Sequence, residues 1–191
     1  VGNPTNEWLG ADRQTRFLLF SVSKCVIATA THMLLDDGDI RVDDPVHWYI
    51  PEFGKHGKHH VTIRHLLTHS AGIPWIFWDV DEGIIQDWDH IIETLCDQEP
   101  DYFPGRFTAY HTLSGGYILA EIIQRITDLT IREFLSRRLC EPMGLDTLNY
   151  GVTEEWYEQT ARIERVDNLP PAPITQLVCR IVDVDIPTAL E

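Results

Sequence analysis

Apolar residues recur at three- and four-residue spacing in one segment after another, and this period constrains the fold more than any other feature. Between residues 21 and 37 the apolar positions lie on one helical face, and Gly38 follows directly. One face of a helix repeats every 3.6 residues and glycine commonly ends a helix, so the pattern predicts a helix over 21–37. We therefore expect a helix-rich fold.

Other segments carry similar helix signals, and few carry strand signals. A helix is expected at 62–69 with Thr62 as its N-cap, around 88–95, at 117–126, and at 130–142, where Thr130-x-x-Glu133 forms a capping box; 153–155 reads as another helix start. Asp44-Pro45 should open a turn or short helix that Pro51 closes. The best strand candidate is 177–184, so we expect too few strands for a complete domain.

The charge balance excludes several classes of protein. The 191 residues hold 15 Lys plus Arg against 30 Asp plus Glu, a formal net charge of −15. Nucleic acids and anionic membrane surfaces bind basic footprints, so neither is an expected partner. Nine acids and no Lys or Arg fall within 75–105, where the spacing predicts an acidic amphipathic helix. This stretch could bind Ca²⁺ or a basic partner, but a solvated helix face is the preferred interpretation.

Other sequence features bear on the membrane, the cysteines and the compartment. No run of eighteen apolar residues occurs, so we expect no membrane span. The four cysteines, Cys25, Cys96, Cys140 and Cys179, form no C-x-x-C pair and are expected to be buried free thiols. No signal peptide is visible, which favours the cytoplasm, although the first residues look like the middle of a longer protein. The compartment and the oligomeric state stay open.

One tetrad could carry chemistry. Ser21-Val22-Ser23-Lys24 is an S-x-x-K sequence in a chain with only five Ser and three Lys. Ser21 lies where an apolar segment meets a helix start, and Lys24 follows on the same helix face. A serine hydroxyl attacks poorly unless a nearby base takes its proton, and a lysine one turn away can support that transfer. A capping serine beside a solvated lysine is the alternative interpretation of the tetrad alone.

Several segments together resemble the serine β-lactamase and penicillin-binding-protein superfamily, in particular its class C β-lactamase and family VIII carboxylesterase branch. The matching segments are 20–24, 35–40, 43–45, 61–74 (VTIRHLLTHSAGIP), Pro104-Gly105 with Tyr110, Gly116-Tyr117 and 142–145. They follow the order and spacing of the family and span roughly residues 16–150. The resemblance implies an α+β, β-lactamase/transpeptidase-like fold whose antiparallel sheet lies largely outside this chain. We thus expect 1–191 to be a single partial domain.

The resemblance also implies roles for individual residues. Ser21 would be the acylated nucleophile, Lys24 its proton-managing partner, and Tyr110 the tyrosine of the family's second motif, acting as general base or proton shuttle. A phenol is a base near neutral pH only if a close ammonium lowers its pKa. His111 could contact substrate or hold Tyr110 in place, and Trp75 could line the substrate pocket. No metal and no organic cofactor is implied.

Two positions depart from the family pattern. Thr112 stands where the second motif has Asn, which favours the esterase-like branch and puts recognition of a β-lactam side chain in doubt. The third motif, a Lys, His or Trp two residues before Gly, has no match after Tyr110. Lys55-His56-Gly57 has the letters but precedes the tyrosine in a polar loop, so it is interpreted as a chance match.

The expected function is a serine hydrolase that acts through a seryl-enzyme intermediate on a small ester or amide. A carboxylesterase with weak β-lactamase activity is preferred. The alternatives are a non-catalytic or slowly turning over penicillin-recognising module and a D-Ala-D-Ala-type peptidase. His65 and His69, four residues apart on a predicted helix, have a metal-compatible spacing. Without an H-E-x-x-H sequence, a zinc site there is not the expected reading.

Overall fold

The computed structural model describes residues 11–75, 87–151, 154–157 and 159–161. The chain forms two compact units: residues 20–151, and a second unit made from residues 1–19 and 152–191. The elements of the larger unit are η1 (Phe20–Val22), α1 (Ser23–Asp37), η2 (Val46–Trp48), η3 (Pro51–Gly54), η4 (Lys58–His60), α2 (Ile63–Leu67), α4 (Trp88–Asp97), α5 (Ser114–Thr127), α6 (Ile131–Leu135), η5 (Ser136–Cys140) and α7 (Glu141–Met143).

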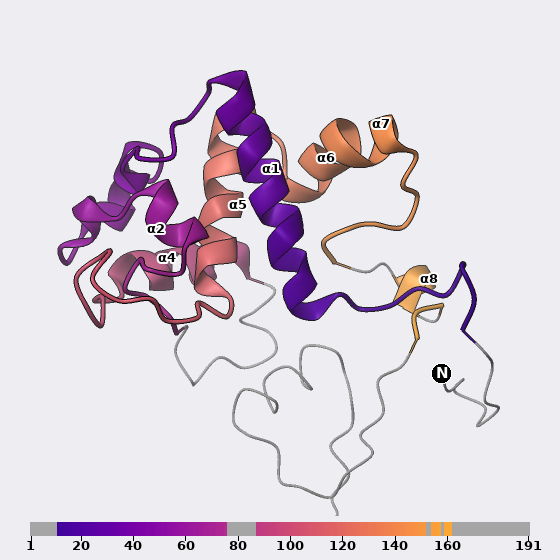
Figure 1. Ribbon diagram of the computed structural model, residues 1–191, viewed down its shortest axis with the longest axis horizontal. Helices are drawn as coiled ribbons and strands as arrows, with labels where there is room; N and C mark the ends of the chain where they lie inside the picture. Colours follow the sequence, from indigo (N-terminus) through magenta and orange to yellow (C-terminus); the bar gives the residue numbers. More distant parts are fainter. Residues whose placement is uncertain (1–10, 76–86, 152–153, 158, 162–191) are drawn as a thin grey trace, which may run out of the picture. The chain divides into compact units, whose positions relative to one another are not determined.

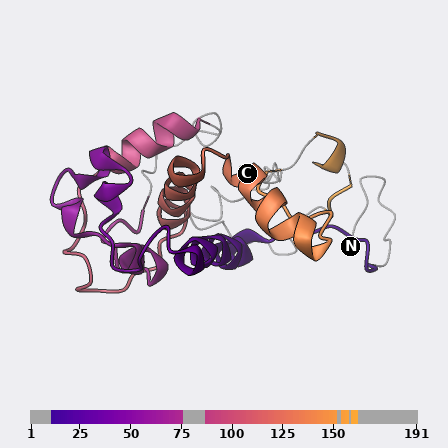
Figure 2. The same cartoon turned by 90° about the horizontal axis from the view of Figure 1, so that it is seen from above.

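Helix α5 is the centre of the larger unit. Figures 1 and 2 show α1 along one side of α5 and the α2 and α4 helices on the other. Most of α5 is buried, because its apolar residues lie on more than one face; these are Ile118, Leu119, Ala120, Ile122 and Ile123. A helix that is apolar on several faces must be covered by its neighbours, so α5 organises the core.

The helix ends follow the signals in the sequence. Gly38 adopts a left-handed φ of +82° and ends α1, as expected. Thr62 and Thr130 both form capping boxes, in which the side chain accepts the N–H of the third helical residue and that residue's side chain accepts the cap's N–H. These three predictions are confirmed. The expected helix at 117–126 is also confirmed, as α5.

Of the other expectations, one needs correction, one is confirmed and one cannot be compared. Pro51 does not close the turn that starts at Asp44; it begins η3, where its fixed φ suits a first helical position. The helix opened by Thr130 is confirmed: it passes through a π-helical turn, η5, and its last part, α7, ends at Met143, next to the expected end near Pro142. The described residues contain two isolated β-bridges, and none of these residues belongs to an extended strand. The predicted strand at 177–184 lies outside the described residues, so the sheet expectation stays a prediction.

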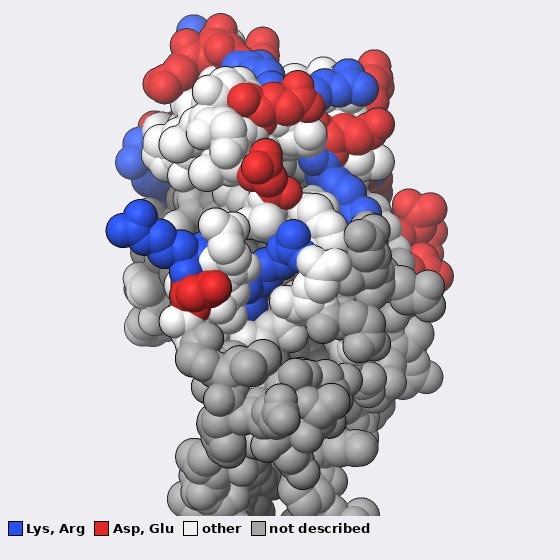
Figure 3. Space-filling model, turned by 90° about the vertical axis from the view of Figure 1, so that its right-hand side faces the viewer, with Lys and Arg blue, Asp and Glu red and all other residues white. Residues whose placement is uncertain are grey.

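The acidic helix is present as α4, with its apolar face in the core. Ile91, Ile92 and Leu95 are buried, whereas Asp89 and Glu93 are exposed. Asp89 and Glu93 therefore lie on a solvated helix face, in line with the preferred interpretation, while Asp79, Asp81 and Glu82 lie outside the described residues. Asp97, the last residue of α4, pairs with Lys55, and Figure 3 shows acidic and basic side chains interspersed on one face.

A buried lysine closes the end of α4. Lys58 has no exposed surface, and its ammonium donates to the carbonyl oxygens of Cys96, at 3.0 Å, and of Gln98. The C-terminal carbonyls of a helix carry partial negative charge, so they compensate a cation there. Burial nevertheless lowers the pKa of Lys58 below its ordinary value. This lysine therefore has a structural place, well apart from the S-x-x-K tetrad in sequence.

The thiols agree only partly with expectation. Cys96 and Cys140 are buried and free, as predicted, but Cys25 is a free thiol on the exposed face of α1. Cys179 lies outside the described residues. No described helix is long and apolar enough to cross a membrane.

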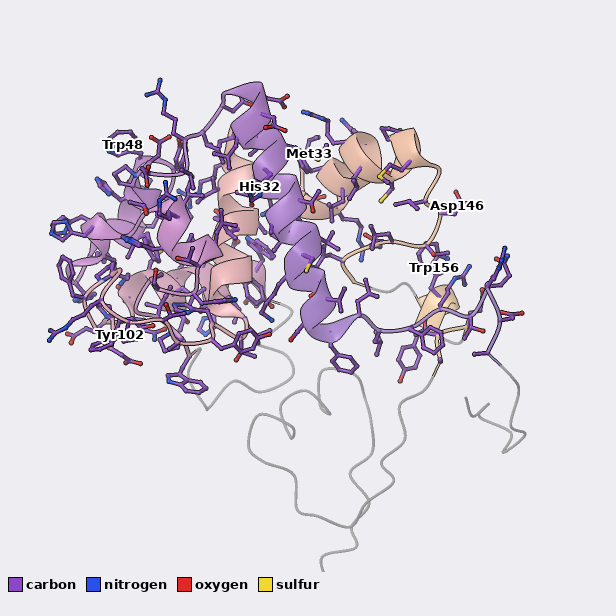
Figure 4. The ribbon with its side chains drawn as sticks, in the orientation of Figure 1. His32, Met33, Trp48, Tyr102, Asp146 and Trp156 are labelled. Carbon is purple, nitrogen blue, oxygen red and sulfur yellow. The ribbon has the colours of Figure 1, made fainter. Side chains whose placement is uncertain are left out.

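The smaller unit brings residues near both ends of the chain together. Its helix α8 (Glu154–Tyr157) confirms the start expected at 153–155. The carbonyl oxygen of Arg16 accepts the N–H of Ala161 at 2.9 Å, and the guanidinium lies 4.9 Å from the ring centre of Trp156, which Figure 4 labels on α8. Among the described residues, Arg16 thus links the two segments.

Candidate active site

The S-x-x-K serine lies at the entry to α1. Ser21 is the middle residue of the single turn η1, directly before the helix begins at Ser23. Phe20, the residue before it, has a φ of +46°, a left-handed conformation that is uncommon for an aromatic residue. The Ser23 hydroxyl donates to the Phe20 carbonyl oxygen and supports this turn. The backbone thus changes direction sharply at Ser21 and leaves its side chain exposed at the helix start.

Three predicted residues meet at the Ser21 hydroxyl. The Tyr110 hydroxyl donates to Ser21 Oγ at 2.6 Å, although 89 residues separate the two in sequence. Lys24 Nζ donates to the same oxygen at 3.3 Å and lies 4.8 Å from the centre of the Tyr110 ring. All three groups are therefore within reach of one proton, which is the geometry that a serine nucleophile and its base require.

The electrostatics of Tyr110 suit a proton acceptor. Burial on its own would raise the pKa of the phenol, but its hydrogen bonding with Lys24 and with Ser21 and the charge of Lys24 outweigh this effect. The net result is a pKa for Tyr110 below its ordinary value. A nearby ammonium favours the phenolate, which is the condition under which a tyrosine can act as a base near neutral pH.

His111 directly follows Tyr110 in the chain, and its side chain has no exposed surface. Its Nε2 accepts the N–H of Ile73 at 3.2 Å, and its Nδ1 donates to the carbonyl oxygen of Ala109 at 2.6 Å. Burial lowers the pKa of His111, so the ring is neutral and this tautomer fits both bonds. Both ring nitrogens bond to the backbone, which fits the alternative in which His111 holds Tyr110; a substrate contact by His111 stays a prediction.

Trp75 and Thr112 are the other two positions that the sequence singled out. Trp75 follows the buried Ile73 and Pro74 and is 44% exposed, so its side chain has surface to offer a ligand. Thr112 directly follows His111 and is half-buried. A substrate contact by Trp75 remains a proposal.

The histidines considered for metal binding are engaged with the backbone. His65 Nδ1 accepts the N–H of Thr62 in the α2 capping box, at 3.2 Å. His69 Nδ1 accepts the N–H of His111, at 3.2 Å. Within the described residues, no three His, Cys, Asp or Glu side chains are grouped so that they could hold a metal ion.

A ladder of backbone hydrogen bonds supports the Tyr110 segment, residues 101–111. The N–H groups of Asp101, Gly105 and Ala109 donate to the carbonyl oxygens of Gly72, Ser70 and His69, at 2.8, 2.8 and 3.0 Å. The segment 69–73 therefore supports 101–111 along its length. Tyr110 reaches Ser21 because this ladder fixes its backbone.

Gly72 gives a test of this ladder. Its φ is +86°, and a Cβ there would lie 2.4 Å from the Tyr102 carbonyl oxygen. We expect Gly72→Ala to destabilise the protein by about 2–4 kcal/mol, because strain at positive φ adds to a backbone clash. Urea unfolding of the full-length protein measures this change. Gly116→Ala is the matched control, since a Cβ at Gly116 meets nothing within 4 Å; equal unfolding free energies for the two variants would contradict the prediction.

A serine hydroxyl that is hydrogen-bonded to both a lysine and a tyrosine is the arrangement expected of acyl-transferring serine enzymes. A family model described as Beta-lactamase matches residues 4–179. The chain therefore belongs to the beta-lactamase family, whose members include esterases, β-lactamases and penicillin-binding proteins. The β-lactamase/transpeptidase-like fold implied by the sequence motifs is confirmed at this level.

Individual relatives agree with this assignment. The chain is 30% identical over 146 residues to Esterase/beta-lactamase LipL of Mycobacterium tuberculosis, a match that covers 75% of this chain and 33% of LipL. A penicillin-binding protein homologue from Caulobacter crescentus superposes with a TM-score of 0.79 at 31% identity, covering 88% of this chain and 45% of that one. A family VIII carboxylesterase gives 0.74 at 25% identity, covering 96% and 48%. The chain thus spans about a third to a half of these relatives.

Proposed function

We propose that the full-length protein is a carboxylesterase that transfers the acyl group of a small ester to Ser21 and then to water. The observation that carries the proposal is the 2.6 Å hydrogen bond between Tyr110 and Ser21 Oγ, with Lys24 bonded to the same oxygen. Tyr110 lies 89 residues after Ser21, so its contact with this hydroxyl is not a consequence of local sequence. Esterase relatives, LipL and the family VIII enzyme, support the same activity.

The first half of the reaction forms the acyl-enzyme. Tyr110, as phenolate, takes the Ser21 proton while Oγ attacks the ester carbonyl carbon, and the carbonyl oxygen becomes an oxyanion. Backbone N–H groups at the start of α1 are suited to bind this charge. The C–O bond of the ester then breaks, and Tyr110 returns the proton to the departing alkoxide, which leaves as the alcohol.

The second half releases the acid. Water attacks the carbonyl carbon of acyl-Ser21 and gives a proton to Tyr110, and the bond to Oγ breaks as that proton returns to Ser21. Lys24 transfers no proton in these steps; its charge stabilises the phenolate. The net reaction is ester plus water to acid plus alcohol, with no cofactor in the steps.

Thr112 supports an ester over a β-lactam as the substrate. The resemblance places an Asn at this position in enzymes that recognise β-lactam side chains, and Thr has no amide to donate and accept there. Weak β-lactamase activity is compatible with the same site, since both reactions pass through an acyl-serine.

A penicillin-recognising module is the second candidate, and one observation favours it. The penicillin-binding protein homologue from Caulobacter crescentus superposes with a TM-score of 0.79. Such a module would acylate Ser21 with penicillin but release the product slowly or not at all.

Four reagents separate these functions in the complete gene product. A fluorophosphonate probe reports nucleophilic attack by Ser21, which displaces fluoride and leaves a phosphonyl-serine, and a fluorescent penicillin reports acylation; p-nitrophenyl butyrate and nitrocefin report turnover. We expect fluorophosphonate labelling and rapid p-nitrophenyl butyrate hydrolysis. Stable penicillin labelling without hydrolysis of either substrate would support the module instead, and faster turnover of nitrocefin would support a β-lactamase. Absence of any labelling at Ser21 would reject all of these functions.

A further inference from the structure

His69 lies shortly after α2, at the start of the segment 69–73 that supports the Tyr110 segment. The chain leaves α2 at Leu67, and His69 then adopts a left-handed φ of +57°. Few non-glycine residues adopt this conformation without a compensating contact. The side chain is half-buried, and the backbone turn at His69 directs it toward the segment that carries Tyr110.

His69 accepts two hydrogen bonds, one from the residue before Tyr110 and one from the residue after it. Its carbonyl oxygen accepts the N–H of Ala109 at 3.0 Å, and its ring Nδ1 accepts the N–H of His111 at 3.2 Å. The His69 ring also packs against the Tyr110 ring, with 5.0 Å between their centres. One residue therefore contacts the backbone on both sides of Tyr110 and the phenol ring itself.

The ring bond needs a neutral histidine with a particular tautomer. Nδ1 accepts a hydrogen bond, so the ring proton must be on Nε2. Burial and the charge of Lys24 lower the pKa of His69, which keeps it neutral. The titratable groups that act on it or pack against it are Lys24 from α1 and Tyr110 and His111 from the supported segment.

We propose that His69 is a positioning residue that holds the Tyr110 hydroxyl at proton-transfer distance from Ser21, through the acceptor at Nδ1. This rests on the proposed function. His69 itself transfers no proton to substrate. Its effect passes through the backbone at His111 and the face of the phenol ring, and a displacement of about 1 Å at Tyr110 can cost about 10²-fold in rate.

Three variants of the full-length protein test the role of the acceptor. His69→Asn keeps an acceptor, Oδ1, near the position of Nδ1, and Asn tolerates a left-handed φ. His69→Leu keeps comparable bulk beside Tyr110 but has no acceptor. His69→Gly suits the φ of +57° and removes both the ring and the acceptor, so it serves if the Leu variant fails to fold.

The readout is kcat per active site, with the active sites counted by fluorophosphonate labelling. Fluorophosphonate titration gives the concentration of competent Ser21, and p-nitrophenyl butyrate hydrolysis is divided by it. We expect His69→Leu and His69→Gly to lower kcat per site by about 10²-fold with KM changed far less, and His69→Asn to restore most of the loss. A residue that only supports folding would lower the fraction of titratable enzyme and leave kcat per site unchanged.

A second readout follows Tyr110 directly. Ultraviolet titration of each variant, minus the same variant with Tyr110→Phe, gives the pKa of this phenol. Release of Tyr110 from Lys24 should raise its pKa in the Leu and Gly variants but not in the Asn variant.

The outcomes separate the two proposals. If the wild-type protein is not labelled, the proposed function fails and the role of His69 fails with it. If the wild-type protein is active and the folded Leu or Gly variant has the same kcat per site, the role of His69 alone is rejected. A folded Asn variant as slow as the Leu or Gly variant also rejects it, because the acceptor would then have no effect.

Discussion

Ser21→Ala in the complete gene product is expected to abolish fluorophosphonate labelling and to lower ester hydrolysis by about 10⁴-fold or more. The hydroxyl oxygen that accepts hydrogen bonds from Tyr110 and Lys24 is the atom that would carry the acyl group. Without it no acyl-enzyme can form, and the remaining groups can only assist direct attack by water. Intact-mass spectrometry after exposure to the probe measures the acylation, and p-nitrophenyl butyrate measures the turnover.

Two other serines provide the controls. Ser136→Ala changes an exposed hydroxyl that donates to Glu141, so labelling and rate should be unaffected. Ser23 is the second serine of the tetrad, but its hydroxyl donates to the Phe20 carbonyl oxygen. Ser23→Ala should therefore keep covalent labelling. A near-normal esterase rate in Ser21→Ala would mean that Ser23 or a different mechanism is responsible.

The local half of this site could be predicted from the sequence. Ser21 and Lys24 are one helical turn apart, and the helix follows from apolar spacing and from Gly38, so their proximity needs no tertiary information. The capping boxes at Thr62 and Thr130 are equally local. Each of these features depends on residues within a few positions of one another, which is the range over which sequence patterns determine structure.

The distant half could be predicted only from the family resemblance. Tyr110 lies 89 residues after Ser21, and no spacing rule brings them together. The contact of His69 with His111 is likewise non-local, and the interpretation of His69 as a possible metal ligand missed it. The expected helix over 62–69 includes His69, whereas α2 ends at Leu67 and His69 lies in the turn that follows it.

The exposure of Cys25 was predictable but overlooked. Cys25, Thr29, His32 and Asp36 follow one another at three- and four-residue spacing, so they share one face of α1, and all four are exposed. Figure 4 shows His32 on this helix. The apolar face that the sequence identified is the other one. Residue type favoured burial of the thiol, whereas the helical period, which decided the outcome, favoured exposure.

Lys24→Ala is expected to lower the rate of Ser21 acylation by about 10³-fold or more. Two effects combine, because Lys24 donates to Ser21 Oγ at 3.3 Å and its charge also lowers the pKa of Tyr110. Removal of the ammonium takes away one hydrogen bond and makes the phenolate rarer at neutral pH. Stopped-flow acylation by a fluorescent penicillin or by p-nitrophenyl butyrate, read as the pre-steady-state burst, measures this step apart from deacylation.

The pH dependence separates the two effects of Lys24. A phenol with a lowered pKa becomes a base at lower pH, so acylation by the wild-type protein should rise with pH through that lowered value. Without Lys24 the pKa of Tyr110 returns upward, and the rising limb should move to higher pH, so that alkali recovers part of the lost rate. Lys55→Ala is the matched control, since Lys55 pairs with Asp97 on the surface. A tenfold or smaller loss with an unshifted limb would show that Lys24 does not manage the proton, and that Tyr110 is activated by another group.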